Sequence, residues 1–254
     1  MRTEILYEDK SIMVVRKPAG LAVQSAGIGQ PDVVSELKSY LAKLPGAGRP
    51  GKGEPYLGIV HRLDQPVEGL LVFAKDKKAA AALSKQLAEG ALNKHYYAVL
   101  CGYPDCPEGD LVDYLRKEGN VAVAVTGREQ EFADAKIAVL HYRILEEIND
   151  PSPLALADVT IGTGRFHQIR VQFAHAGFPL LGDTKYGTAA RKEAMPAQKY
   201  RGVALCAYSL ELVHPISGKK MGFRVVPKNP AFAGFAMEEL KKLTENETGI
   251  SKRG

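Results

Sequence analysis

One short stretch of the sequence places polar side chains where an expected strand ends in a turn. Residues 58–60 read as the strand end, and His61, Arg62 and Asp64 follow before an apolar run that begins at Leu70. Catalytic groups are often displayed at such strand ends, and Arg62 flanks this carboxylate. A single aspartate of this kind is more often part of a salt-bridged turn, so the stretch alone leaves both interpretations open.

A second stretch, Thr163 to Arg170, is rich in hydrogen-bond donors and runs directly into apolar residues. It contains Arg165, His167 and Gln168 as well as Arg170. Two arginines beside buried residues favour contact with an anion or a carboxylate, because the guanidinium fork binds both. The alternative is an internal polar network that ties elements together, and it fits His167 and Gln168 better than it fits the arginines.

A third stretch, residues 94–99, alternates along an expected strand. Tyr96 then shares a face with Ala98, and Tyr97 faces the other way. One tyrosine ring could therefore stack on a base, as aromatic rings do in RNA sites. Packing in the core is the simpler interpretation of this stretch by itself.

Together the stretches resemble the RluA-like family of RNA pseudouridine synthases. The opening residues 5–23 also look like the family's first strands and its Lys-Pro-Gly turn, so the resemblance covers residues 3–226. Several ordered motifs in one chain are far more specific than any one of them. The matching residues are His61-Arg62-Leu63-Asp64, Lys94 with Tyr96 and Ala98, and Thr163 to Arg170 running on to Gly182-Asp183 and Tyr186-Gly187.

The resemblance implies a role for each candidate site residue. Asp64 would be the essential carboxylate, which attacks the target uridine, on the base or on the sugar, so that the glycosidic bond breaks and C5 rejoins the sugar. Arg170 would pair with Asp64 and keep it ionised, and Tyr96 would stack against the target base. Arg62 would hold the RNA stack open when the uridine is flipped out. The residues expected to hydrogen-bond backbone or RNA phosphate are His61, Arg165 and His167.

The chain departs from the family pattern just after Asp64. The family usually has a Thr-Ser-Gly stretch there, whereas this chain has Gln65-Pro66-Val67-Glu68-Gly69. A Glu68 side chain that pointed inward would bring a second negative charge to the nucleophile. We expect Glu68 to point outward as a solvated side chain.

The elements that position these residues are predicted from periodicity and from turn residues. Helices are expected after the caps Asp32, Asp76 and Asn229, over residues 33–44, 77–88 and 230–243. Long strand runs with few helices predict an α+β fold. The resemblance specifies a pseudouridine synthase catalytic fold, with a large, mostly antiparallel mixed β-sheet flanked by helices and loops. Strands are expected at residues 5–7, 12–16, 21–23, 57–60, 70–74, 96–100, 137–145, 155–161, 169–173, 203–212 and 221–225.

One catalytic domain is expected over residues 1–244, followed by a polar tail at residues 245–254. Because the expected strands begin near Glu4, we expect no N-terminal RNA-binding domain of the S4 type. RNA recognition then falls to the catalytic domain itself. The regions expected to contact RNA are residues 45–55, 112–131 and 185–201, with a plain surface loop as the alternative for the first and the last.

The composition is that of a globular protein with a mild preference for anionic partners. The chain has 254 residues, of which 45% are hydrophobic, and a formal net charge of +5. Its three cysteines and its histidines show no metal-ligand spacing, so no metal is expected. The isomerisation that the resemblance implies consumes no redox or group-transfer reagent, so no organic cofactor is expected. No apolar run could span a bilayer and no signal peptide is recognisable, which predicts a cytoplasmic protein that does not enter membranes.

The expected partner is a structured RNA, either ribosomal or transfer RNA, bound by a monomeric protein. The main alternative is a catalytically weak relative that binds RNA and helps it fold, since the same basic surface would serve both roles. A second alternative is a carboxylate-dependent hydrolase acting on a nucleoside or sugar, in which Glu68 would be the partner of Asp64. The arginine-rich stretch at residues 163–170 has no role in such a hydrolase.

Overall fold

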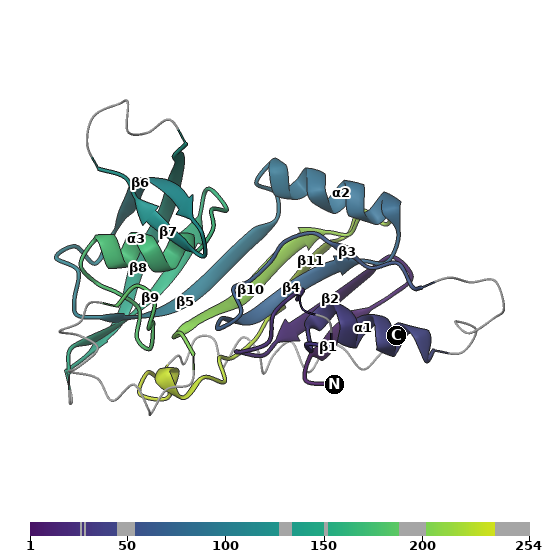
Figure 1. Ribbon diagram of the computed structural model, residues 1–254, viewed down its shortest axis with the longest axis horizontal. Coiled ribbons are helices and arrows are strands. Elements are labelled where there is room, and N and C mark those ends of the chain that lie inside the picture. The colour runs from purple at the N-terminus through teal and green to yellow at the C-terminus, as the bar shows by residue number, and fades with distance from the viewer. Residues whose placement is uncertain are drawn as a thin grey trace. The chain divides into compact units, whose positions relative to one another are not determined.

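The chain folds into two compact units, each formed by segments that are distant in sequence. The first unit comprises Met1–Asn93 and Ala207–Val226, and the second comprises Lys94–Cys206 and residues 227–236. Their elements can be followed in Figure 1. The single domain expected over residues 1–244 stays a prediction. The computed structural model describes residues 1–25, 27, 29–44, 54–126, 134–149, 152–187 and 202–236, so the expected tail lies outside the described residues.

The first unit is built on antiparallel strands. β1 pairs with β2, β2 with β4, β3 with β4, and β10 with β11. Every residue of β2 and β4 is buried, including their charged side chains, which means that both faces of these strands are covered. The strands are β1 (Glu4–Glu8), β2 (Ile12–Lys17), β3 (Gly58–Ile59), β4 (Glu68–Ala74), β11 (Lys220–Arg224) and most of β10 (Leu205–Val213).

Two capped helices belong to the first unit. α1 (Val33–Ala42) begins after Asp32 and α2 (Lys77–Ala88) begins after Asp76, and each aspartate accepts a hydrogen bond from a backbone N–H of the first turn. Both expected helices and both caps are confirmed, because an N-cap aspartate is a local signal. α2 packs against β3 and β4, the two strands that flank the segment containing Asp64.

The second unit is an antiparallel sheet with one helix packed against it. α3 (Gln168–His175) lies against β6 and β7, and Leu115 of β6 is buried in the small core between them. On the opposite face of β6, Val112 and Tyr114 are exposed, as the alternation of a strand requires. The strand order is β5 (Asn93–Cys101), β9 (Leu154–Ile161), β8 (Lys136–Ile148), β6 (Glu108–Glu118) and β7 (Val121–Ala124).

Two expected elements are wrong. Residues 169–173, expected as a strand, lie in α3. Polar and apolar residues alternate from Gln168 to Phe173 with the period of a strand, and the pattern misleads because all six are buried in the helix. The helix expected at residues 230–243 is a short 3-10 turn, Pro230–Phe232, after the expected Asn229 cap. Gly234 disfavours a longer helix, and residues 237–243 lie outside the described part of the chain.

Other differences concern short or charged strands. β6 and β7 have no counterpart among the expected strands, although β6 alternates regularly between exposed and covered positions. The strand expected at residues 21–23 is reduced to a single bridge between Ala22 and Asp32. No helix in the described residues is long and apolar enough to cross a membrane.

Candidate active site

The turn that carries Asp64 starts where β3 ends. Just beyond β3, the side chain of His61 pairs with β4 in place of a backbone carbonyl. Its Nε2 accepts a 3.3 Å hydrogen bond from the Val72 N–H of β4. The chain then leaves the sheet, so that Arg62 is exposed and Asp64 is half-buried. His61 thus contacts the backbone, one of the two kinds of partner expected for it, and its contact with RNA stays a prediction.

Backbone hydrogen bonds hold the Asp64 turn against the Lys-Pro-Gly turn. The Val67 N–H donates to the Asp64 carbonyl over 3.1 Å and closes the turn. The Gln65 carbonyl accepts from the Gly20 N–H at 2.8 Å and from Nζ of Lys17 at 3.0 Å. The Asp64 carboxylate is therefore presented from a fixed support, as a catalytic group requires.

Lys17 is fully buried beneath this turn. Its Nζ donates to three backbone carbonyls at 2.7 to 3.0 Å, including that of Gln65. Burial lowers the pKa of Lys17 to about 7, although the carboxylates of Asp64 and Glu68 act to raise it. Sequence reasoning assigned no role to Lys17, and its place in the Lys-Pro-Gly turn was the available signal.

The expectation that Glu68 is solvated is wrong. Glu68 lies on β4 and is 3% exposed, and its Oε2 is 3.5 Å from Nη2 of Arg16 on β2. Arg16 is buried too, and its Nη2 donates a 2.7 Å hydrogen bond to the Val226 carbonyl. Because β4 is covered on both faces, a side chain on it cannot reach solvent. The ion pair engages Glu68 and disfavours the hydrolase alternative, in which Glu68 would assist Asp64.

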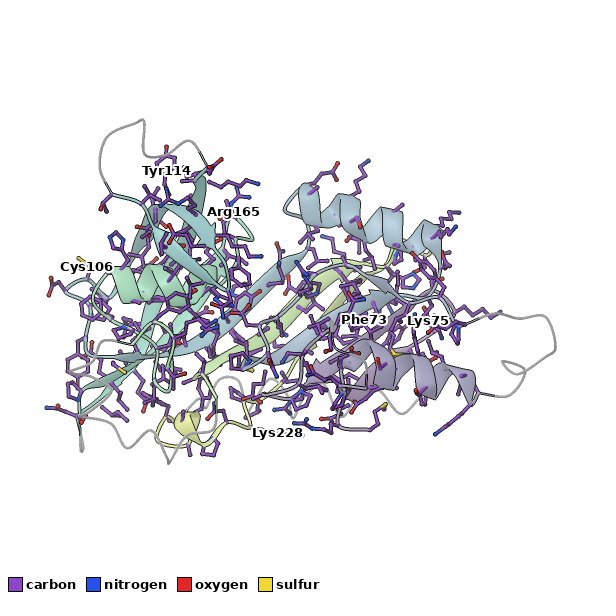
Figure 2. The ribbon with its side chains drawn as sticks, in the orientation of Figure 1. Phe73, Lys75, Cys106, Tyr114, Arg165 and Lys228 are labelled. Atoms are coloured by element: carbon purple, nitrogen blue, oxygen red, sulfur yellow. The ribbon has the colours of Figure 1, made fainter. Side chains whose placement is uncertain are left out.

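In the second unit, Gln168 fastens the loop at residues 162–167 to β8. Its Oε1 accepts from the Arg165 N–H at 2.9 Å, and its Nε2 donates to the Val139 carbonyl at 3.0 Å. Arg165, labelled in Figure 2, donates from Nε to the Ile137 carbonyl at 2.9 Å. The internal-network interpretation therefore holds for Gln168. The contact of Arg165 with RNA phosphate stays a prediction.

His167 precedes α3 in a left-handed backbone conformation, with φ 53° and ψ 26°. Its Nδ1 lies 2.7 Å from the hydroxyl of Tyr186, and that hydroxyl accepts a 2.8 Å hydrogen bond from the Ala122 N–H of β7. The hydroxyl proton is then directed at Nδ1, which acts as the acceptor. His167 thus ties α3 to β7, as the internal-network alternative anticipates, and its contact with RNA stays a prediction.

Arg170 on α3 forms a buried, bidentate ion pair with Asp183. Its Nε lies 2.7 Å from Oδ2 and its Nη2 lies 2.9 Å from Oδ1. The guanidinium also lies over the Tyr186 ring, 5.1 Å from the ring centroid. The pairing of Arg170 with Asp64 implied by the resemblance stays a prediction. Sequence reasoning included Asp183 and Tyr186 in the matched motif but gave neither of them a role.

Tyr96 lies on β5 opposite Val159 of β9. It is 5% exposed and Tyr97 is 6% exposed, so exposure does not single out either ring for stacking on a base. Burial lowers the pKa of Lys94, which shares the face of Tyr96 two residues earlier. The stacking role of Tyr96 stays a prediction.

The candidate residues thus gather at two places in the chain. His61, Arg62 and Asp64 lie on one turn of the first unit. Arg165 and His167 precede α3 in the second unit, Arg170 lies in its first turn, and Tyr96 lies on β5 of the same unit. Within the described ranges, no group of histidine, cysteine, aspartate and glutamate side chains could hold a metal ion. Cys101, Cys106 and Cys206, all within the described ranges, are in the thiol form. The regions expected to contact RNA include residues 45–53, 127–133 and 188–201, which lie outside the described residues.

Known proteins resemble this chain over most of its length. The family model described as RNA pseudouridylate synthase matches residues 11–175. The chain is 37% identical over 227 residues to the Ribosomal large subunit pseudouridine synthase D of Zymomonas mobilis, covering 87% of this chain and 68% of that protein. It is 36% identical over 227 residues to the protein of the same name from Pseudomonas aeruginosa, covering 86% and 66%. The chain spans about two thirds of the length of these relatives.

Solved structures confirm the fold class. Human RNA Pseudouridylate Synthase Domain Containing 4 superimposes with a TM-score of 0.68 at 25% identity, covering 94% of this chain and 93% of that one. Human RNA Pseudouridylate Synthase Domain Containing 1 gives a TM-score of 0.70 at 19% identity, covering 96% and 94%. The expected α+β fold, with extensive antiparallel sheet and few helices, is therefore confirmed.

Proposed function

The chain belongs to the family of RNA pseudouridylate synthases, and from this premise we propose that it isomerises uridine to pseudouridine in large-subunit ribosomal RNA. One observation carries the proposal: within the matched region, Asp64 stands half-buried on a turn fixed by Gly20 and Lys17. Large-subunit RNA is proposed because the relatives from Zymomonas mobilis and Pseudomonas aeruginosa are named for acting on it.

In this proposal Asp64 is the nucleophile. Its carboxylate oxygen bonds to the uridine, and the bond between N1 and C1′ breaks. The base rotates, C5 bonds to C1′, and the bond to Asp64 breaks so that the carboxylate is regenerated. The proton on C5 leaves while N1 gains one. No atom is gained or lost by the nucleoside. An ionised carboxylate is needed for the attack, and Arg170 is proposed to pair with Asp64 and keep it ionised. Fixing the carboxylate on a rigid turn lowers the entropic cost of bringing it to the uridine.

The target uridine must leave the RNA stack before Asp64 can reach it. Arg62 is proposed to hold the stack open, which its exposure and its place two residues before Asp64 support. Tyr96 is proposed to stack on the extruded base, and Arg165 and His167 to bind phosphate. His61 is proposed to support the turn through its hydrogen bond to β4 and to lie against the RNA there.

We propose that the protein acts as a cytoplasmic monomer and that its partner is structured RNA. Neither a metal nor an organic cofactor is required, because the reaction rearranges one nucleoside without net oxidation or group transfer. The mildly basic net charge of +5 suits an anionic partner.

The test uses unmodified transcripts of large-subunit ribosomal RNA and of transfer RNA. Each is incubated with the protein, digested to nucleosides and separated by liquid chromatography, which resolves pseudouridine from uridine although their masses are equal. Pseudouridine in the ribosomal transcript alone is the expected result. Pseudouridine only in the transfer RNA would overturn the substrate, and RNA binding without pseudouridine in either would favour the catalytically weak RNA-binding alternative.

A further inference from the structure

An aromatic ring outside the catalytic candidates is exposed beside two positive charges. Phe166 follows Arg165 in the loop before α3 and is 39% exposed. Its ring stacks on that of His167, with centroids 3.8 Å apart and an interplanar angle of 21°. Nζ of Lys117 on β6 lies 5.0 Å from the centroid of the Phe166 ring. No part of the function proposed above uses Phe166 or Lys117.

The ring beneath Phe166 is held rigidly. His167 keeps a left-handed backbone conformation that a residue with a side chain rarely adopts, so its surroundings must maintain it. Tyr186 does so through its hydroxyl, 2.7 Å from Nδ1 of His167, and through its ring, which meets the His167 ring edge-on. Tyr186 is itself fixed, because its hydroxyl accepts from the Ala122 N–H and its backbone N–H donates to Asp183. Phe166 therefore rests on a preorganised support.

The charges beside Phe166 are available to an anion. In the part of the chain that the structure describes, Lys117 contacts the Phe166 ring, and Arg165 donates from Nε to the Ile137 carbonyl. Neither cation is paired with a described carboxylate, since Glu118, the acid next to Lys117, pairs with Arg116. An exposed ring with one cation over it and a second on the neighbouring residue matches a nucleotide, whose base is aromatic and whose phosphate is negative.

We propose that Phe166 is a stacking platform for an unpaired base of the RNA substrate, and that Lys117 and Arg165 bind the phosphates beside that base. The inference rests on the proposed function, because it presumes an RNA substrate. In the free protein, the Lys117 side chain covers the Phe166 ring. When RNA binds, the base takes this place on the ring and Lys117 moves to a phosphate. Phe166 then contributes to the choice of RNA without taking part in the isomerisation.

The simpler interpretation is that Phe166 only covers the His167 ring. The two interpretations differ in what they require of the side chain. A cover needs an apolar group of suitable size, which leucine supplies, whereas a stacking platform needs an aromatic face, which leucine lacks. Phe166→Leu therefore separates them, and Phe166→Tyr should preserve the platform.

The experiment measures kcat and KM for tritium release from a large-subunit ribosomal RNA transcript labelled at uridine C5. The matched control is Tyr56→Leu, which removes an exposed aromatic ring outside the regions expected to contact RNA. We expect Phe166→Leu to raise KM about tenfold with kcat changed less than about twofold, in line with the loss of one stacked base. Phe166→Tyr and Tyr56→Leu should keep the KM of the parent protein.

Two results would overturn the inference. One is a Phe166→Leu protein with unchanged KM, and the other is a Phe166→Tyr protein as impaired as the leucine variant. Retention of the same transcript on a filter gives the affinity of each variant independently of turnover. If the parent protein binds RNA but releases no tritium, the proposed function fails, and the filter affinities of the leucine and tyrosine variants still decide the role of Phe166.

Discussion

Asp183 forms a buried ion pair with Arg170 of α3, and its replacement should destabilise the protein strongly. Its side chain is fully buried and accepts hydrogen bonds of 2.7 Å and 2.9 Å from Arg170. Asp183→Asn removes the negative charge and leaves the buried guanidinium with a neutral partner. We expect the free energy of unfolding, measured by urea denaturation, to fall by about 3 kcal/mol.

Asp110→Asn is the matched control for that measurement. Asp110 also contacts a basic side chain, Nδ1 of His141 at 2.9 Å, but its side chain is 65% exposed. Because water screens such a pair, the variant should lose less than about 1 kcal/mol. If both variants lost the same unfolding free energy, burial would not be what makes the Asp183 ion pair important for stability.

Lys17 should give the protein a specific pH dependence of stability. Burial lowers its pKa to about 7 in the folded protein, from an ordinary value of 10.5. Between these two values the unfolded chain binds more protons than the folded one. The free energy of unfolding therefore rises with pH across this window, by at most about 1.4 kcal/mol per pH unit, and the contribution levels off below about pH 7.

Lys17→Met isolates this contribution, because the substitution removes the titrating group and keeps a long side chain. Urea denaturation of both proteins, repeated at steps between about pH 7 and about pH 10, gives two stability curves. The parent curve should climb relative to that of the variant. Parallel curves would show that Lys17 keeps an ordinary pKa in the fold.

At the scale of the elements, the approach of β4 to β10 depends on Gly69. The residue has φ +128°, and a Cβ added to it would collide with the carbonyl oxygen of Ala207 and lie 2.5 Å from the Ala207 nitrogen. Backbone atoms of a paired strand cannot move aside without breaking the ladder. Gly69→Ala is expected to lower the free energy of unfolding by more than about 3 kcal/mol, measured by thermal unfolding of the soluble fraction.

Gly20→Ala serves as the comparison. Gly20 also has a positive φ, +79°, but a Cβ there would meet nothing within 4 Å. Only the backbone strain remains, and its cost is about 1 kcal/mol. If the two alanine variants were equally stable, the close contact between β4 and Ala207 would not be the reason for the glycine.

Elements with local signals could be predicted from the sequence, and those without could not. The starts of α1 and α2 follow from Asp32 and Asp76, each of which caps the turn next to it. α3 was mistaken for a strand because polar and apolar residues alternate from Gln168 to Phe173, although all six are buried in the helix. The turn that carries Asp64 could be predicted, but the burial of Glu68 could not, because it depends on what covers both faces of β4.

At the scale of the whole chain, the first unit is stabilised by contacts between segments that are far apart in the sequence. Nε2 of His214 lies 2.7 Å from Oδ2 of Asp9, a residue 205 positions away. Nδ1 of His214 accepts a 3.0 Å hydrogen bond from the Ser217 N–H, so the proton on Nε2 is donated to Asp9. No local sequence pattern predicts a contact between such distant residues, so His214 was given no role from the sequence.

His214→Ala should therefore lower the free energy of unfolding by about 2 kcal/mol, because it leaves the Asp9 carboxylate and two backbone N–H groups without their partner. His141→Ala, at a histidine whose side chain is 46% exposed, should cost less than about 1 kcal/mol. Urea denaturation of the two variants measures the difference. A negligible loss of unfolding free energy in His214→Ala would mean that other contacts hold the two segments of the first unit together.

The central claim concerns Asp64, and tritium release from uridine C5 tests it most directly, because the new bond to C5 must expel that hydrogen. The parent protein and Asp64→Asn are compared on the same labelled large-subunit ribosomal RNA, with thermal unfolding and filter retention showing that both are folded and bind it. We predict release by the parent protein and none by the variant. Release by Asp64→Asn at the parent rate would contradict the account, because the nucleophile would then be another group.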